Sequence, residues 1–293
     1  MKSFFKIVLK TIIHKIFYIT KLSNTFRKIL DIIIDENSQN LRRINTNNSY
    51  LFFYQTNLIT KYRIDSFFQK EPETLEWIDS FKQKSEFWDV GANIGLYSIY
   101  AAKTKNCNVT AFEPSVFNLD LLASNIYVNS LHKKINILPI ILANKNSMGL
   151  FQNSSITHGT ALSTLIQNND NFANPLISEC EYKLPVFKLN LIPSIFKLRK
   201  PKYLKIDVDG LEHQILLGSN DILKNLQSLL IEVDERDPIQ TKNIYQLLDK
   251  NGFYLKNEGG RSKIDVSKCK IRPVLRDYTN SRKLRMNSPD SAI

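Results

Sequence analysis

The sequence predicts an α/β protein with a mainly parallel sheet covered by helices on both faces. From residue 86 onward, short apolar segments alternate with segments of helical period, which is typical of βαβ units. The chain has only 9 glycines, yet Gly91 and Gly95 flank an asparagine just after the first of these apolar segments. Glycine serves where the backbone bends tightly or approaches a ligand, and parallel sheets bind ligands beyond the carboxyl ends of their strands. A hydrophobic content of 43% supports a packed core.

The first 66 residues are expected to form a basic, amphipathic helical extension with a short strand. Residues 1–30 contain seven Lys or Arg and no acidic residue. Such a helix either packs its apolar face on the domain or lies on an anionic membrane surface as a peripheral contact, and the sequence leaves both open. Its lysines interrupt the apolar run too often for a membrane-spanning helix or a secretory signal.

The segments after this extension can be assigned in order. Strands are expected at residues 49–55, 86–90, 108–113, 135–141, 203–207, 228–233 and 253–255, with a last strand at 270–275. Helices are expected at residues 71–81, 94–105, 116–129, 211–226 and 241–250. The polar residues 142–185 predict an excursion over the sheet on the substrate side. The main domain then covers residues 67–277, and residues 278–293 form a basic polar tail.

The strands predicted at 86–90 and 108–113, the first and second of the alternating segments, lead into a nucleoside-binding pattern. Gly91 allows a sharp turn after the first strand, and Gly95 lets the next helix pack closely on it. The loop is not the GxGxxG pattern of dinucleotide-binding folds. Glu113 ends the second strand about 20 residues later, where an acidic side chain can accept hydrogen bonds from both ribose hydroxyls.

A second polar cluster follows the strand at 203–207, in the segment "KIDVDGLEH". Its candidate site residues are Lys205, Asp207, Asp209, Glu212 and His213. Asp207 or His213 could serve as a general base, because a carboxylate or an imidazole beside a ligand can accept a proton. We expect no metal to be required, although Asp207 and Asp209 could bind one.

Four segments together resemble the FkbM family of S-adenosylmethionine-dependent methyltransferases: "FWDVGANIGLYS", "AFEPSVFNLDLLASNI", "KIDVDGLEHQILLG" and "LLIEVDE". The upstream "KEPETLEWI" is similar to the segment before the core of such proteins. The resemblance spans roughly residues 67–235. It implies a Rossmann-like class I methyltransferase fold, with a seven-stranded sheet whose last strand is antiparallel. It also implies in-line methyl transfer from S-adenosyl-L-methionine to a hydroxyl of a sugar, glycan or other small molecule.

By matched positions, the resemblance assigns site residues. The methionine side of the cofactor would be lined by Asp89, Gly91, Asn93 and Gly95. Glu113 would bind ribose, and the adenine edge would pass Pro114 and Ser115. Asp207 would face the transferable methyl and the acceptor, with Asp209 and Glu212 in the same loop. From the residues themselves, His213 and Lys205 complete the candidate catalytic set. Asn190 stands where similar sequences carry an aspartate, and we expect it to cap the helix that follows.

Three other functions compete with this interpretation. A glycosyltransferase could use Asp207-Val208-Asp209 as a D-x-D metal site, but the glycine loop and Glu113 would then be unexplained. A nucleic-acid methyltransferase is disfavoured, because the Asn/Asp-Pro-Pro-aromatic motif is absent and the basic residues lie at the chain ends. A cofactor-binding or membrane-scaffold protein without catalysis is the third alternative. We expect no nucleic-acid partner.

The cysteines bear on the compartment. Cys107, Cys180 and Cys269 are widely spaced and form no CxxC motif, so neither a zinc site nor a disulfide framework is indicated. This favours a cytoplasmic protein, with association at the inner face of a membrane as the alternative that the basic N-terminus raises. The sequence does not predict the oligomeric state.

Overall fold

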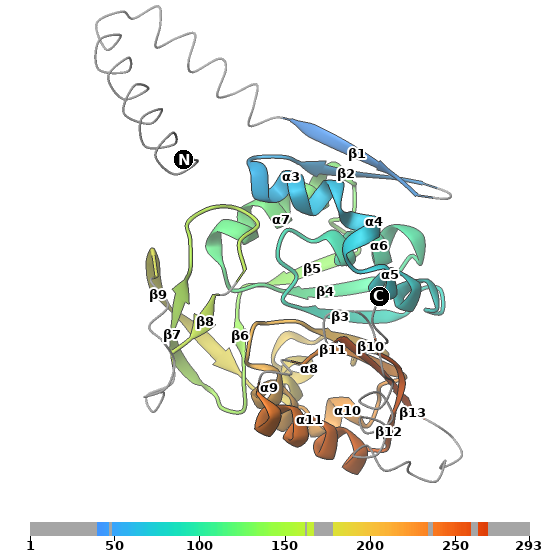
Figure 1. Ribbon diagram of the computed structural model, residues 1–293, viewed down its shortest axis with the longest axis vertical. Coiled ribbons are helices and arrows are strands. Elements are labelled where there is room, and N and C mark those ends of the chain that lie inside the picture. The colour runs from blue at the N-terminus through green and yellow to red at the C-terminus, as the bar shows by residue number, and fades with distance from the viewer. Residues whose placement is uncertain are drawn as a thin grey trace, which may run out of the picture.

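The computed structural model describes residues 40–46, 49–161, 163–166, 178–233, 237–258 and 263–268 (Figure 1). The predicted N-terminal amphipathic helix, the predicted strand at 270–275 and the polar tail lie outside these residues. Within them, no helix has both the length and the apolar character needed to cross a membrane.

A central sheet of mainly parallel strands organises the fold, as predicted. Its strand order is β12-β13-β11-β10-β3-β4-β5, and the five strands from β11 to β5 are parallel. β13 pairs antiparallel with both of its neighbours. The strand bounds are β3 Glu86–Val90, β4 Asn108–Phe112, β5 Ile135–Leu138, β10 Tyr203–Ile206, β11 Ser228–Glu232, β12 Phe253–Glu258 and β13 Lys263–Lys268.

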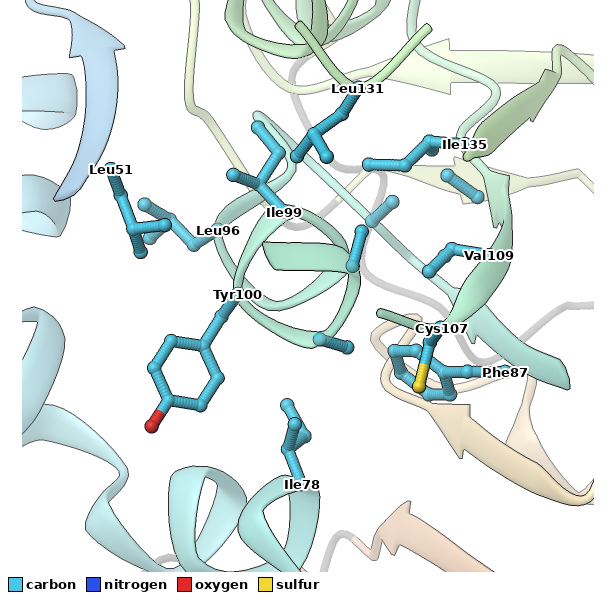
Figure 2. Packing of buried hydrophobic residues seen from close by; sticks show 14 of the residues in the cluster. Leu51, Ile78, Phe87, Leu96, Ile99, Tyr100, Cys107, Val109, Leu131 and Ile135 are labelled. Carbon is cyan, nitrogen blue, oxygen red and sulfur yellow. The ribbon is translucent and has the colours of Figure 1, made fainter. Parts of the chain in front are cut away.

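Helices cover both faces of this sheet, because successive strand residues bury their side chains on opposite sides. Phe87 and Trp88, neighbours on β3, belong to two different apolar clusters. The Phe87 cluster packs against α5 Pro72–Asp79, α6 Leu96–Thr104 and α7 Val116–Val128, as Figure 2 shows around Ile99. The Trp88 cluster packs against α9 Glu212–Leu217, α10 Asn220–Leu223 and α11 Pro238–Lys250. The short helices η1 Leu189–Leu191 and α8 Ile192–Phe196 also contribute to this second cluster.

An N-terminal hairpin and two short helices precede the sheet. Strand β1 Leu41–Asn45 pairs with β2 Tyr50–Tyr54, which matches the strand expected at 49–55. Asn125 of α7 and Asn129, which caps the end of α7, accept hydrogen bonds from the backbone of β2 and so fix the hairpin on the domain. Helices α3 Leu58–Asp65 and α4 Phe67–Lys70 follow and were not predicted.

The excursion contains a second sheet. Its strands run in the order β6-β9-β7-β8, with bounds β6 Ile141–Leu142, β7 Ser147–Asn153, β8 Thr164–Leu165 and β9 Cys180–Phe187. The expected strand at 135–141 was therefore too long. β5 ends at Leu138, and Ile141 pairs with Val186 of the second sheet.

Two further expectations were wrong in detail. The helix expected at 211–226 is divided into α9 and α10, because at Gly218 a side chain would lie 2.5 Å from the Ala143 carbonyl oxygen, so that only glycine fits this close contact. Asn190 caps a helix, but not the one that follows it. Its side-chain oxygen accepts hydrogen bonds from the backbone N–H groups of Asp221 and Ile222, in the first turn of α10.

Candidate active site

A cavity of about 210 Å³ lies beyond the carboxyl ends of β3, β4 and β10. Helices α3, α4, α6, α7 and α9, strand β11 and the second sheet also contribute residues to its wall. The structure brings together at this cavity seven of the residues that the sequence singled out: Gly91, Asn93, Glu113, Pro114, Lys205, Asp207 and Asp209. Five others do not line it: Asp89, Gly95, Ser115, Glu212 and His213.

The two glycines of the loop serve different contacts. Gly91 has a φ of +83°, and a Cβ there would lie 1.9 Å from the backbone oxygen of Asp207. Gly91 therefore lets the end of β3 pass directly beside the end of β10. Gly95 has a φ of +88°, and a Cβ there would lie 2.5 Å from Leu122 of α7. The close contact at Gly95 is thus with helix α7, whereas we expected it to be with the strand, and Gly95 does not line the cavity.

Glu113 is a buried carboxylate at the carboxyl end of β4. One of its oxygens accepts a hydrogen bond from the backbone N–H of Asn93 at 2.7 Å, and the other accepts one from Ser115 at 2.9 Å. Burial raises the pKa of Glu113 to about 7, although these two backbone hydrogen bonds oppose the increase. Each carboxylate oxygen has two lone pairs, so Glu113 can accept further hydrogen bonds from a pair of hydroxyls in the cavity.

Lys205 and Asp207 form an ion pair at the carboxyl end of β10. The Lys205 Nζ lies 2.9 Å from an Asp207 oxygen and 3.6 Å from Asp89 on β3. Lys205 is only 2% exposed. Burial opposes its charge, but the nearby carboxylates of Asp207, Asp89 and Glu71 outweigh burial and raise its pKa. Lys205 is therefore a protonated counterion that cannot accept a proton. Both residues line the cavity, and Asp207 is the more exposed of the two.

The sequence did not single out the remaining members of this charged network. Glu71, between α4 and α5, lines the cavity and is 5% exposed. It accepts a hydrogen bond from the Tyr97 hydroxyl at 2.7 Å and lies 3.1 Å from the Lys70 ammonium. Burial and the Glu71 carboxylate both raise the pKa of Tyr97. The segment "KEPETLEWI" contains Glu71, and its resemblance to the family was the signal that could have identified this residue.

The network carries an excess of negative charge. Its three carboxylates belong to Glu71, Asp89 and Asp207, and its two ammonium groups belong to Lys70 and Lys205. Among these five groups the carboxylates outnumber the ammonium groups by one, beside a cavity that is partly closed from water. Such a site favours a cationic ligand.

The loop after β10 accounts for the other predicted residues. Glu212 accepts hydrogen bonds from the backbone N–H groups of Val208 and Gly210, which closes the turn into α9. Burial raises the pKa of Glu212, and those hydrogen bonds oppose the increase. His213 is half-buried on α9 and does not face the cavity. In the described part of the chain, no three His, Cys, Asp or Glu residues gather in a way that could hold a metal ion.

Part of the excursion forms one wall of the cavity, through Thr160, Ala161 and Ser163. The Asn93 side chain donates a hydrogen bond to the Thr160 backbone oxygen at 2.8 Å. The glycine loop and the excursion are therefore joined directly at the cavity.

Comparison with known proteins places this arrangement among methyltransferases. A sequence model described as the methyltransferase FkbM domain matches residues 89–255. A hexuronic acid methyltransferase, AglP of Haloferax volcanii, is 24% identical over 173 residues, which are 58% of this chain and 64% of that protein. The match thus spans less than two thirds of that relative.

Two solved structures are distantly similar in fold. The methyltransferase FkbM from Methylobacillus flagellatus has a TM-score of 0.43 and 14% identity, over 64% of this chain and 44% of that one. TrmK of M. capricolum, solved with S-adenosyl-homocysteine, has a TM-score of 0.39 and 14% identity, over 69% of this chain and 71% of that one.

Proposed function

Because the chain belongs to the FkbM methyltransferase family, whose members use S-adenosylmethionine, we propose that it transfers a methyl group from this cofactor to a hydroxyl of a sugar, glycan or other small molecule. The observation that carries the proposal is the placement of two carboxylates on one cavity. Glu113 lies at the end of β4 and Asp207 lies just beyond the end of β10, on either side of the Gly91 turn.

The residues present fit the cofactor. The backbone N–H groups of Asn93 and Ser115 hold the Glu113 carboxylate in place. This carboxylate can still accept hydrogen bonds from two ribose hydroxyls. The carboxylates of Glu71 and Asp207, which both line the cavity, suit a sulfonium cation. The ion pair of Lys70 and Glu71 offers one charge of each sign, which matches the carboxylate and ammonium groups of the methionine moiety. When bound, the cofactor supplies an electrophilic methyl group.

Asp207 is the residue that we assign to the acceptor. Its carboxylate reaches the cavity, and the buried ammonium of Lys205 holds one of its oxygens. It can therefore accept a hydrogen bond from an acceptor hydroxyl, orient that oxygen for in-line displacement and receive its proton. Lys205 is a positioning residue in this mechanism, because its buried ammonium holds the Asp207 carboxylate at 2.9 Å.

The similarity to AglP supports a sugar as the methyl acceptor. AglP is a hexuronic acid methyltransferase, and we extend to this chain only the broader class of a sugar acceptor.

The alternative function, a glycosyltransferase with a D-x-D metal site at Asp207 and Asp209, predicts a strict need for a divalent ion. We expect methyl transfer to continue in the presence of EDTA, and complete loss of turnover there would favour the glycosyltransferase interpretation.

The direct test is to incubate the protein with cofactor labelled in the methyl group and with separated glycan, lipid and RNA fractions of the host cell. We expect label in a glycan or glycolipid fraction, stable to mild alkali because methyl ethers resist hydrolysis. Alkali-labile label would indicate a carboxyl ester, and label in RNA would contradict the acceptor class. Asp207→Asn protein provides the background rate.

Peripheral membrane contact through residues 1–30 stays part of this proposal, on the strength of their seven basic residues. A smaller share of the protein lacking residues 1–34 than of the full chain should be found in the membrane fraction of lysed cells. Equal distribution of the two forms would contradict it.

A further inference from the structure

Arg63 places a positive charge on the cavity that the proposed mechanism does not use. It lies on α3, is half-buried, and lines the cavity together with Phe67 one turn later. Its Nε donates a hydrogen bond to the backbone oxygen of Gly159 at 2.6 Å. One edge of the guanidinium is therefore anchored to the excursion, which limits the directions in which the rest of the group can point.

The anchor itself is firmly held. The Gly159 N–H donates a hydrogen bond to the Asn118 side chain of α7 at 2.8 Å. Gly159 has a φ of +81°, and a Cβ there would lie 3.1 Å from the Thr60 methyl group on α3. The neighbouring His158 accepts a hydrogen bond at its backbone oxygen from Asn57, just before α3. Helix α3 and this turn of the excursion are thus locked together around Arg63.

The charge of Arg63 differs from that of the other cavity cations. Lys70 is paired with Glu71, and Lys205 is paired with Asp207. Arg63 makes no salt bridge with any residue that the structure describes. A guanidinium held at a cavity wall by its Nε, and without a salt bridge to any described carboxylate, is suited to bind an anion through its remaining N–H groups.

We propose that Arg63 binds a carboxylate of the methyl acceptor, so that the acceptor is an acidic hydroxyl compound such as a uronic acid. This inference rests on the proposed function. The cofactor also carries a carboxylate, but the pair of Lys70 and Glu71 already offers matching charges for the whole methionine zwitterion. Arg63 belongs instead with the excursion, which we predicted to cover the acceptor.

The test separates the two carboxylates by calorimetry. S-adenosylhomocysteine is first titrated into wild-type, Arg63→Gln and Arg43→Gln protein. D-glucuronate and D-glucose are then titrated into each protein after saturation with S-adenosylhomocysteine. Arg43 is an exposed arginine of β1 that does not line the cavity, so its variant controls for the loss of one positive charge.

We expect the wild type to bind glucuronate more tightly than glucose. Arg63→Gln should weaken glucuronate binding about 10- to 100-fold, as loss of a charged hydrogen-bonded pair does. Arg43→Gln should leave it unchanged. S-adenosylhomocysteine affinity should be the same in all three proteins, which also shows that the cavity has folded. Arg63→Lys, which keeps the charge without the planar fork, should recover part of the glucuronate affinity.

Other outcomes would overturn the inference. If Arg63→Gln weakens S-adenosylhomocysteine binding and leaves glucuronate binding intact, the arginine serves the cofactor carboxylate. If the wild type binds glucuronate and glucose equally, or binds neither, the cavity does not select an acidic acceptor. Failure of the wild type to bind S-adenosylhomocysteine would instead contradict the proposed function, so the two failures are distinguishable.

Discussion

The Lys205 ammonium lies 2.9 Å from the Asp207 carboxylate, and the lysine side chain is almost fully buried beneath the cavity floor. This ion pair places the proposed catalytic carboxylate at the end of strand β10, beside the cavity. The carboxylates around the buried lysine keep it charged, and its ammonium holds the Asp207 carboxylate in place. The position of the Asp207 carboxylate is thus fixed before any ligand binds.

Asp207→Asn should lower turnover much more than cofactor affinity. The amide keeps the size of the carboxylate but cannot accept the proton of an acceptor hydroxyl. We expect kcat to fall about 100-fold or more, in the range of lost general-base catalysis. S-adenosylhomocysteine affinity, measured by calorimetry, should change little. Asp221→Asn, at an exposed carboxylate of α10, is the matched control. Equal losses of kcat and affinity would show that Asp207 acts on the cofactor instead.

Lys205→Met should destabilise the protein by about 3–5 kcal/mol, because removal of one partner leaves buried carboxylates without a counterion. Urea unfolding of the two proteins gives this difference. The additional change Asp89→Asn should restore part of the stability, since it removes one of the uncompensated charges. Simple addition of the two separate losses would contradict coupling between Lys205 and Asp89.

Cofactor affinity should rise with pH around neutrality. Burial raises the pKa of Glu113 to about 7, so the carboxylate that accepts the ribose hydroxyls predominates only above that pH. Affinity for S-adenosylhomocysteine should fall by up to about tenfold for each unit below pH 7. Calorimetry between pH 5.5 and pH 8.5 measures this slope. Glu113→Gln should bind weakly at every pH, and a slope that persists in this variant would exclude Glu113 as its source.

The same group affects the stability of the free protein in the opposite direction. The pKa of Glu113 is raised on folding, from 4.5 to about 7. Its contribution to stability is therefore fully present below about pH 4.5 and is lost as pH rises to 7, by about 3 kcal/mol in total. Denaturant unfolding of wild-type and Glu113→Gln protein across this range isolates the effect. A difference between them that does not change with pH would contradict the raised pKa.

The two glycines of the loop should respond differently to alanine. At Gly91, the new Cβ would meet the Asp207 backbone, so we expect a loss of about 3 kcal/mol or more together with loss of activity. At Gly95, it would meet the flexible end of Leu122, so we expect about 1–3 kcal/mol of destabilisation with cofactor binding retained. Unfolding and calorimetry on both variants provide the comparison. Loss of cofactor binding in Gly95→Ala alone would reverse our assignment.

The parts of the structure that follow from local patterns could be predicted from the sequence. The strands β3, β4 and β10 are short, apolar and buried on both faces, and the turn at Gly91 has a strong glycine signal. The general position of Glu113 at the cavity follows from the same regularity, because the carboxyl ends of parallel strands meet at one edge.

Long-range contacts account for what the sequence did not show. Asn190 caps a helix 30 residues away, and Gly218 interrupts a helix because the Ala143 backbone passes beside it. Arg63 reaches the cavity from α3, a helix whose own sequence has no motif for that role, and Glu71 could have been found only through the resemblance of its segment to the family. His213 was a reasonable base by residue type, but the orientation of α9 keeps it away from the cavity, which no local pattern could reveal.

The most direct measurement is a crystal structure of the protein with S-adenosylhomocysteine. The account predicts that the ligand lies between the Gly91 turn and Glu113, with both ribose hydroxyls hydrogen-bonded to the Glu113 carboxylate and its sulfur on the side of Asp207. A ligand bound elsewhere, or one whose ribose makes no contact with Glu113, would contradict it.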